Sequence, residues 1–154
     1  MARSQTEKIL TALAGEYLTA AKLCLMGYIA VPTFKNFPGV DILAYNSATG
    51  RQITLQVKTI SEDGSFVFGR YPLPKDKLDD KRLTVWVHIL DKSKSKADFF
   101  IATFGEVARL AQRGHETWHK EKPATRKLEG GLVNIIGSED LKEFKDKWGL
   151  LEAL

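Results

Sequence analysis

The chain has 154 residues with a single cysteine; 44% of the residues are hydrophobic, and the formal net charge at pH 7 is +4. This length suits one domain, residues 1–154, that buries a core, and the small positive charge permits an anionic partner without requiring one. Because one cysteine excludes an internal disulfide and no apolar run approaches the roughly 18 residues of a membrane span, we expect a cytoplasmic protein without a membrane segment.

The first predicted element is a helix over residues 5–26. A capping-box pattern, Ser4 with Glu7, precedes it, and apolar residues then recur at helical spacing. Glu16 lies inside this helix, and a solvent-exposed flank is the ordinary explanation for such a residue. Residues 28–33 follow as an edge-like strand or an extended lead into the next loop, because the proline within them cannot donate to a neighbouring strand.

Two alternating apolar runs, residues 41–45 and 51–59, predict an antiparallel hairpin with a short loop that contains glycine. If Asn46 pairs with Arg51, this register gathers the apolar side chains of both strands on one face and favours burial there. These side chains are Ile42, Ala44, Ile53, Leu55 and Val57. The opposite face then carries Asp41, Gln56 and Lys58 side by side, so a carboxylate, an amide and an ammonium meet at one end of the hairpin.

The polar face of this hairpin also carries Leu43 and Tyr45, so we expect something to cover part of it. One interpretation of the polar cluster is a structural ion pair between Asp41 and Lys58, because such pairs near strand ends are common and weak. The other interpretation is a functional site, and a resemblance to a known family favours it.

The pattern Gly39-Val40-Asp41 followed by Gln56-Val57-Lys58 resembles the D…(D/E)xK signature of the PD-(D/E)xK, or restriction-endonuclease-like, nuclease superfamily. Glutamine in place of the second acid is similar to the QxK motif of the Mrr-type restriction endonucleases. The resemblance covers roughly residues 5–115. It implies an α/β fold with an αβββαβ core, in which helices flank a mixed central sheet.

The same resemblance implies a metal-dependent DNA endonuclease that acts in restriction, repair, recombination or mobile-element defence. Asp41, the Gln56 side-chain oxygen and the Val57 carbonyl would bind Mg²⁺ or Mn²⁺, and an acid from the first helix, Glu16, would bind directly or through water. Lys58 would orient the water and contact the phosphate, so Asp41, Gln56, Lys58 and Glu16 are the candidate catalytic residues. The expected partner is DNA, double-stranded or branched, and a homodimer is allowed.

The remaining elements complete an α/β pattern. Strands are expected over residues 65–71, 83–90, 97–104 and 131–137, a short helix over 106–112 and a terminal amphipathic helix from 138 onward. The nearly continuous apolar run 83–90 is typical of a central strand covered on both faces. The charged run 75–82 is either a solvated connector or a segment that contacts a phosphate backbone.

Two alternatives to the nuclease remain. Residues 115–119 read His-Glu-Thr-Trp-His, the HExxH spacing of zinc peptidases, but Gly114 and Pro123 leave no apolar helix around them, so a polar surface segment is favoured over a zinc hydrolase. The basic residues over 120–127 suit either nucleic-acid contact or a solvated loop. Because Gln56 is neutral, a nucleic-acid-binding protein that has lost cleavage on the same fold is the main alternative.

Overall fold

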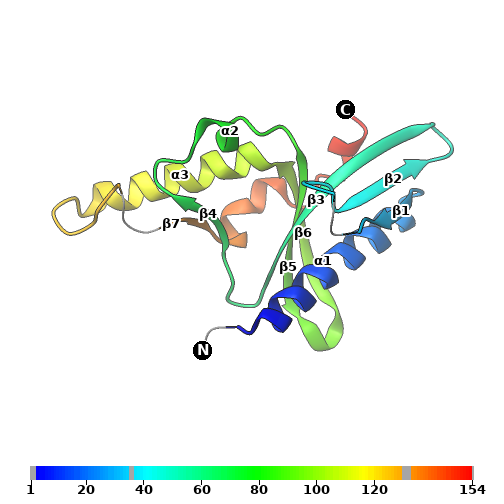
Figure 1. The fold of residues 1–154 in the computed structure, drawn as a ribbon, viewed down its shortest axis with the longest axis horizontal. Coiled ribbons are helices and arrows are strands. Elements are labelled where there is room, and N and C mark those ends of the chain that lie inside the picture. Colours follow the sequence, from blue (N-terminus) through cyan, green and yellow to red (C-terminus); the bar gives the residue numbers. More distant parts are fainter. Residues whose placement is uncertain (1–2, 35–36, 130–132, 154) are drawn as a thin grey trace.

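A computed structural model describes residues 3–34, 37–129 and 133–153. Within these ranges five strands form a mixed sheet in the order β1-β2-β3-β5-β6, and two more form a small sheet, β4-β7 (Figure 1). The strands are β1 (Ile29–Pro32), β2 (Ile42–Asn46), β3 (Arg51–Ser61), β4 (Phe66–Arg70), β5 (Leu83–Asp91), β6 (Lys96–Thr103) and β7 (Val133–Ile136). The helices are α1 (Gln5–Leu25), α2 (Lys75–Leu78) and α3 (Phe104–Glu121), with 3₁₀ helices η1 (Lys92–Lys94), η2 (Ser138–Phe144) and η3 (Trp148–Leu151).

The architecture is mixed α/β, with helices flanking a mixed central sheet, as the sequence predicts. β1, β2 and β3 are antiparallel neighbours, β5 lies parallel to β3, and β6 is antiparallel to β5. From α1 to β5, apart from β4, the chain therefore runs helix, three strands, helix, strand. The strand predicted over residues 65–71 exists as β4, but it pairs with β7 outside the main sheet.

Helix α1 covers one face of the main sheet. It begins with the predicted capping box, in which Ser4 and Glu7 exchange hydrogen bonds. Gly15 marks a close approach of α1 to the sheet, because a Cβ there would collide with the side chain of Thr59 in β3. The core on this face joins apolar residues of α1 to those of β2, β3, β5 and β6.

The opposite face of the sheet is covered over only part of its length. α3 and the small sheet pack on it through an apolar cluster that includes Ile60 and Trp86. Nearer the hairpin loop the same face is open, and Gln52 and Thr54 are exposed. The border between the two regions lies at Gln56, which is buried.

Helix α3 is longer than the helix predicted over residues 106–112. Thr103 and Glu106 form a capping box at its start. Gly114 does not end it, because the helix continues to Glu121 and the next residue, His115, is buried on the packed side of the helix. A helix-stop role for Gly114 is therefore wrong, and the HExxH segment lies within α3.

The predicted terminal amphipathic helix is wrong in form. Its residues make two 3₁₀ helices, separated where Lys145 is extended and bridges to Phe100 and where Asp146 has a φ of +52°. The apolar residues still pack inward, with Leu141, Trp148 and Leu151 all buried. The first two residues of the strand predicted over 131–137 lie outside the described residues.

Candidate functional site

The predicted hairpin is present as β2 and β3. Ile42 pairs with Leu55 and Asn46 with Arg51, so the predicted register is confirmed. The apolar face is buried toward α1, as expected, through Ile42, Ala44, Ile53, Leu55 and Val57. Side-chain alternation then places Gln56 and Lys58 on the other face of β3.

Asp41 closes the β2–β3 ladder. Its backbone N–H donates to the Leu55 carbonyl at 2.8 Å, and its Oδ2 accepts the Val57 N–H at 2.7 Å. None of the ion pairs among the described residues includes Asp41 or Lys58. The interpretation of these two residues as a structural ion pair is therefore wrong, and the Asp41 carboxylate is directed at the backbone of β3.

The backbone of Val57 also faces Asp41. The N–H and C=O of one residue point to the same edge of an extended strand. Because the Val57 N–H bonds Asp41, the Val57 carbonyl faces the same gap. Pairing with β2 stops at Leu55, and pairing with β5 begins at Gln56, so a carboxylate and a carbonyl oxygen meet where β2 leaves β3.

The Gln56 amide supplies a third oxygen. Gln56 is 8% exposed, and its Oε1 is buried without a hydrogen-bond partner in the described part of the chain. An unsatisfied buried oxygen destabilises a protein by about 1–3 kcal/mol, so a cation or water that satisfies it would be stabilising. Carboxylate, amide and backbone carbonyl oxygens are ligands that Mg²⁺ accepts. The residues at this gap therefore fit a hard divalent cation.

Lys58 and Glu16 occupy different sides of the sheet. Lys58 is half-buried, one side-chain repeat beyond Gln56 and beside Trp86 of β5. Glu16 is also half-buried, so the prediction of an exposed flank position is wrong. It shares the i, i+3, i+4, i+7 face of α1 with the buried Thr19, Ala20 and Leu23. α1 packs on the face of the sheet opposite Gln56 and Lys58. The Glu16 carboxylate could therefore share a cation with Asp41 only past the start of β2, where the strand begins at Ile42.

No group of three or more His, Cys, Asp or Glu side chains that could hold a metal occurs among the residues described. A Mg²⁺ site made by the oxygens of Asp41, Val57 and Gln56 needs no such group, because Mg²⁺ keeps several waters and takes few carboxylates. A zinc site at residues 115–119 would need its histidines free. A ring nitrogen of His115 instead lies 3.1 Å from the Leu128 carbonyl, and the ring stacks on Tyr71 with centroids 5.5 Å apart.

Arg82 is a residue of this site that sequence reasoning did not single out. A Cβ on Gly39, which has a φ of +75°, would collide with Nη1 of Arg82. The Asp80 carboxylate raises the pKa of Arg82, and the charge of Asp41 adds a smaller contribution in the same direction. The charged run 75–82 was the only signal in the sequence, and it did not distinguish Arg82 from its neighbours.

The basic segment after α3 folds back on the end of that helix through Arg126. Arg126 Nη1 donates to the Trp118 carbonyl at 2.6 Å and to Glu121 Oε2 at 2.8 Å. The guanidinium also lies over the Trp118 ring, 4.5 Å from its centroid. These contacts give Arg126 and Trp118 a role in holding the loop, whereas the candidate site lies at the other end of the sheet face.

Comparison of the chain with protein-family models gave no match, and searches of curated proteins and of solved structures also gave none. Within the ranges that the structure describes, no helix combines the length and hydropathy needed to cross a bilayer.

Proposed function

We propose that this protein is a metal-dependent endonuclease of the PD-(D/E)xK type that hydrolyses DNA phosphodiester bonds. One observation carries the proposal: Asp41 Oδ2 accepts the Val57 N–H at 2.7 Å where β2 leaves β3, next to Gln56, whose buried Oε1 has no hydrogen-bond partner among the described residues. The succession of α1, β1, β2, β3, α2 and β5 supports it, because the αβββαβ core has the same order of elements once β4, which pairs with β7 outside the main sheet, is set aside.

Each residue has a role that follows from phosphate chemistry. Hydrolysis needs an aligned water and neutralisation of the charge on the phosphate oxygens. A bound Mg²⁺ or Mn²⁺ would supply this neutralisation and lower the pKa of a water ligand. Asp41, Gln56 and Val57 would hold that ion, and Lys58 would orient the water and contact the phosphate. Glu16 would contribute through a water around the end of β2.

A DNA-binding protein without cleavage is the second candidate, and the identity of residue 56 favours it. An amide in place of an acid leaves the site with less negative charge, which weakens the binding of a divalent cation. Such a protein would bind DNA with an affinity that falls with salt and would show no response to Mg²⁺.

A cleavage assay separates the two candidates. Purified protein is incubated with supercoiled, linear, branched and single-stranded DNA in Mg²⁺, Mn²⁺ or EDTA. We expect cleavage only with a divalent cation, and a loss of at least about 100-fold in Asp41→Ala and in Lys58→Ala, because the first removes a ligand of the cation and the second removes a positive charge at the reacting phosphate. Asp63→Ala, in the exposed turn after β3, is the matched control and should cut like the wild type. Undiminished cleavage by Asp41→Ala would remove this site, and salt-dependent binding without cleavage would favour the second candidate.

We also propose a second copy of the chain as a partner. The open face of β1 and β2 exposes four uncharged side chains, Ile29 (63%), Val31 (56%), Leu43 (48%) and Tyr45 (39%). They lie in register, with Ile29 opposite Tyr45 and Val31 opposite Leu43, and they line a shallow hollow of about 720 Å³.

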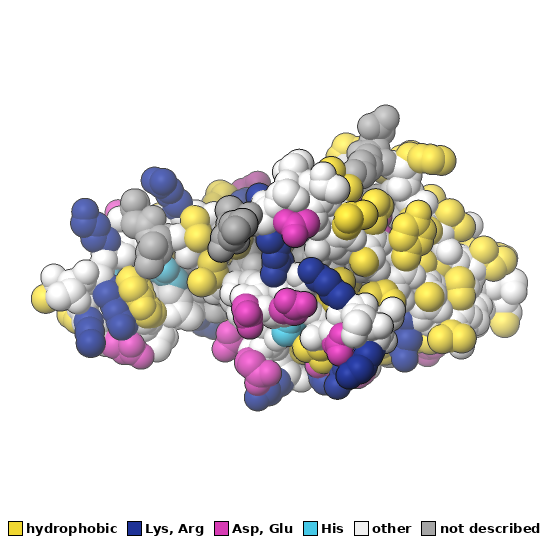
Figure 2. Space-filling model, turned by 90° about the horizontal axis from the view of Figure 1, so that it is seen from below, with side chains coloured by type: hydrophobic (Ala, Val, Ile, Leu, Met, Phe, Trp, Pro, Cys, Tyr) yellow, Lys and Arg dark blue, Asp and Glu magenta, His cyan; other side chains and the backbone are white. Residues whose placement is uncertain are grey.

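β1 is also an edge strand, so its outer backbone groups can pair with another strand. Figure 2, seen from below, shows hydrophobic side chains gathered at the end of the molecule where α1, β1 and β2 lie. An uncharged patch with a free edge is complementary to itself, which suits a two-fold dimer.

A further inference from the structure

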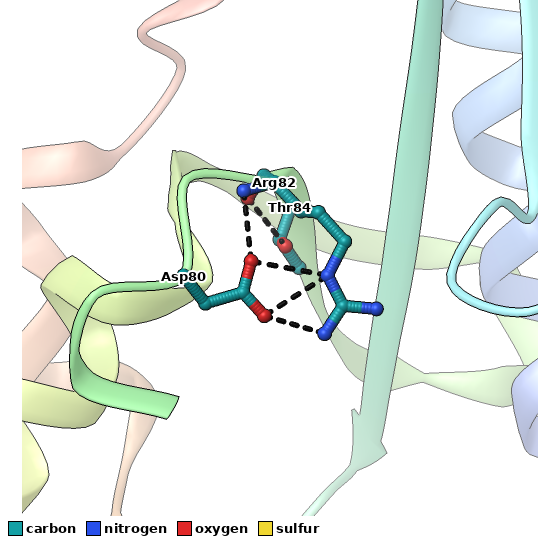
Figure 3. A network of polar contacts seen from close by, with 3 residues as sticks. All are labelled: Asp80, Arg82 and Thr84. Atoms are coloured by element: carbon teal, nitrogen blue, oxygen red, sulfur yellow. Dashed lines mark hydrogen bonds and ion pairs between the residues drawn. The ribbon is translucent and has the colours of Figure 1, made fainter. Parts of the chain in front are cut away.

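Asp80 holds the Arg82 guanidinium in one orientation (Figure 3). Arg82 Nε donates to the two carboxylate oxygens at 3.0 and 2.9 Å, and Nη2 also donates to Oδ2. The Asp80 side chain is only 11% exposed, whereas half of the Arg82 side chain is accessible. In Figure 3 the remaining nitrogen, Nη1, points away from Asp80.

The loop that carries this pair is fixed to the start of α3. The Gly105 N–H donates to the Asp80 carbonyl at 2.9 Å, and the Phe104 N–H donates to the Arg82 carbonyl at 3.0 Å. A Cβ on Gly105 would collide with the carbonyls of Leu78 and Asp80, so the backbone is closely packed here. Arg82 is therefore held in place before any ligand binds, which lowers the entropy lost on binding.

Arg82 lies on the same face of the sheet as the candidate site. Gln56 is beside Thr84 in the parallel register, so Arg82 stands one side-chain repeat before that pair, or about 6.6 Å along the strand. Its Nη1 is directed at Gly39, two residues before Asp41. Lys81 and Arg82 also line a hollow that reaches Gln52 and Thr54, which continues the open face beyond the proposed metal ligands.

We propose that Arg82 binds a backbone phosphate of DNA next to the phosphate that is cleaved, through Nη1 while Asp80 holds the other side of the guanidinium. Arginine is suited to this contact because its charge and fork of donors match phosphate oxygens. Because Asp80 fixes the guanidinium and Arg82 lies two residues before Thr84, the partner of Gln56 in β5, Arg82 positions the DNA and takes no part in the chemical step. This inference rests on the proposed nuclease function.

The test measures DNA binding separately from cleavage. The affinity for a short fluorescent duplex is measured in EDTA, where cleavage does not occur, between about 50 and 200 mM salt. We expect Arg82→Gln to weaken binding about tenfold and to reduce the slope of log affinity against log salt by about one, as for one lost phosphate contact. Arg82→Lys keeps the charge and should retain the wild-type slope. Arg113→Gln, an exposed arginine on α3, is the matched control and should bind like the wild type.

Single-turnover cleavage and urea unfolding complete the test. At saturating DNA, Arg82→Gln should cleave within about twofold of the wild-type rate, because the contact positions the substrate. The inference is overturned if Arg82→Gln binds like Arg113→Gln, if only its unfolding midpoint changes, or if its cleavage rate falls while its affinity does not. A failure of the proposed nuclease function gives a different result. The wild type would then not cut DNA with any divalent cation, whereas the DNA affinities measured in EDTA would still test the contact made by Arg82.

Discussion

Gln56 is the residue whose chemistry differs most between a metal site and a structural hairpin. A glutamate at this buried position, close to the Asp41 carboxylate, would place two negative charges at one gap. We expect Gln56→Glu to lower the free energy of unfolding by about 1–3 kcal/mol without metal, because like charges repel and one carboxylate is buried. Saturating Mg²⁺ should restore roughly 2.7 kcal/mol at 100 times its Kd, because it binds the folded state only.

The control for this substitution lies on the same strand. Gln52 occupies the same face of β3 but is exposed, so Gln52→Glu should change neither the stability without metal nor the response to Mg²⁺. Urea unfolding of both variants with Mg²⁺ and with EDTA measures the difference. An equal loss of stability for Gln56→Glu in both conditions would mean that the amide is a packing residue and no ligand.

At the scale of elements, the hairpin could be predicted from sequence because this register gathers the five apolar side chains of the buried face, whereas a slip by one residue would divide them between the two faces. The β2–β3 pairing and the position of Gln56 and Lys58 follow from it. Arg82 could not be found this way, because its nearness to Gly39 depends on β5 lying parallel to β3 across a long connection. No local pattern encodes that placement.

The helices show the same limit. The start of α1 was predictable because a capping box is a local signal, whereas Gly114 was misread as a helix end because its effect depends on tertiary packing. The burial of Glu16 was also out of reach, since its spacing on α1 is compatible with either the edge or the centre of the packed face. The helix start that a local capping box marks was therefore predicted, whereas the continuation of α3 past Gly114 and the burial of Glu16 depend on distant contacts.

Two helical glycines should respond to alanine with opposite signs. Gly15 lies against Thr59, and a Cβ there would overlap the threonine side chain, whereas Gly114 has open space around its Cβ position. We expect Gly15→Ala to destabilise the protein by about 1–2 kcal/mol through overpacking, and Gly114→Ala to stabilise it by about 0.5–1 kcal/mol through helix propensity. Adding Thr59→Ala to Gly15→Ala should recover part of the loss, because it removes the atoms that collide. Urea unfolding measures all three, and a stabilising Gly15→Ala would contradict the close approach of α1 to β3.

At the scale of the whole molecule, the two halves of the main sheet differ in how many of their faces are covered. One half is covered on both faces, by α1 and by α3 with the small sheet, and forms the rigid scaffold. The other half extends β1, β2 and the start of β3 beyond that cover, with α1 on one face and the apolar patch on the other. The proposed metal ligands and Arg82 lie at the border between these halves, where the covered part of the sheet meets the open surface.

From the exposed apolar patch on β1 and β2, we predict that the protein dimerises through β1. Val31 is 56% exposed on this edge strand, and Val67, on β4 of the small sheet, is 65% exposed. A lysine on an edge strand blocks pairing with another strand, so Val31→Lys should weaken dimerisation at least about tenfold, which corresponds to about 1.4 kcal/mol. Val67→Lys introduces the same charge on the other sheet and should leave the dimer intact. Sedimentation velocity over a range of protein concentrations measures both variants beside the wild type. If the wild type stays monomeric throughout, or if both lysines act equally, the patch on β1 and β2 is not a surface for a second copy of the chain.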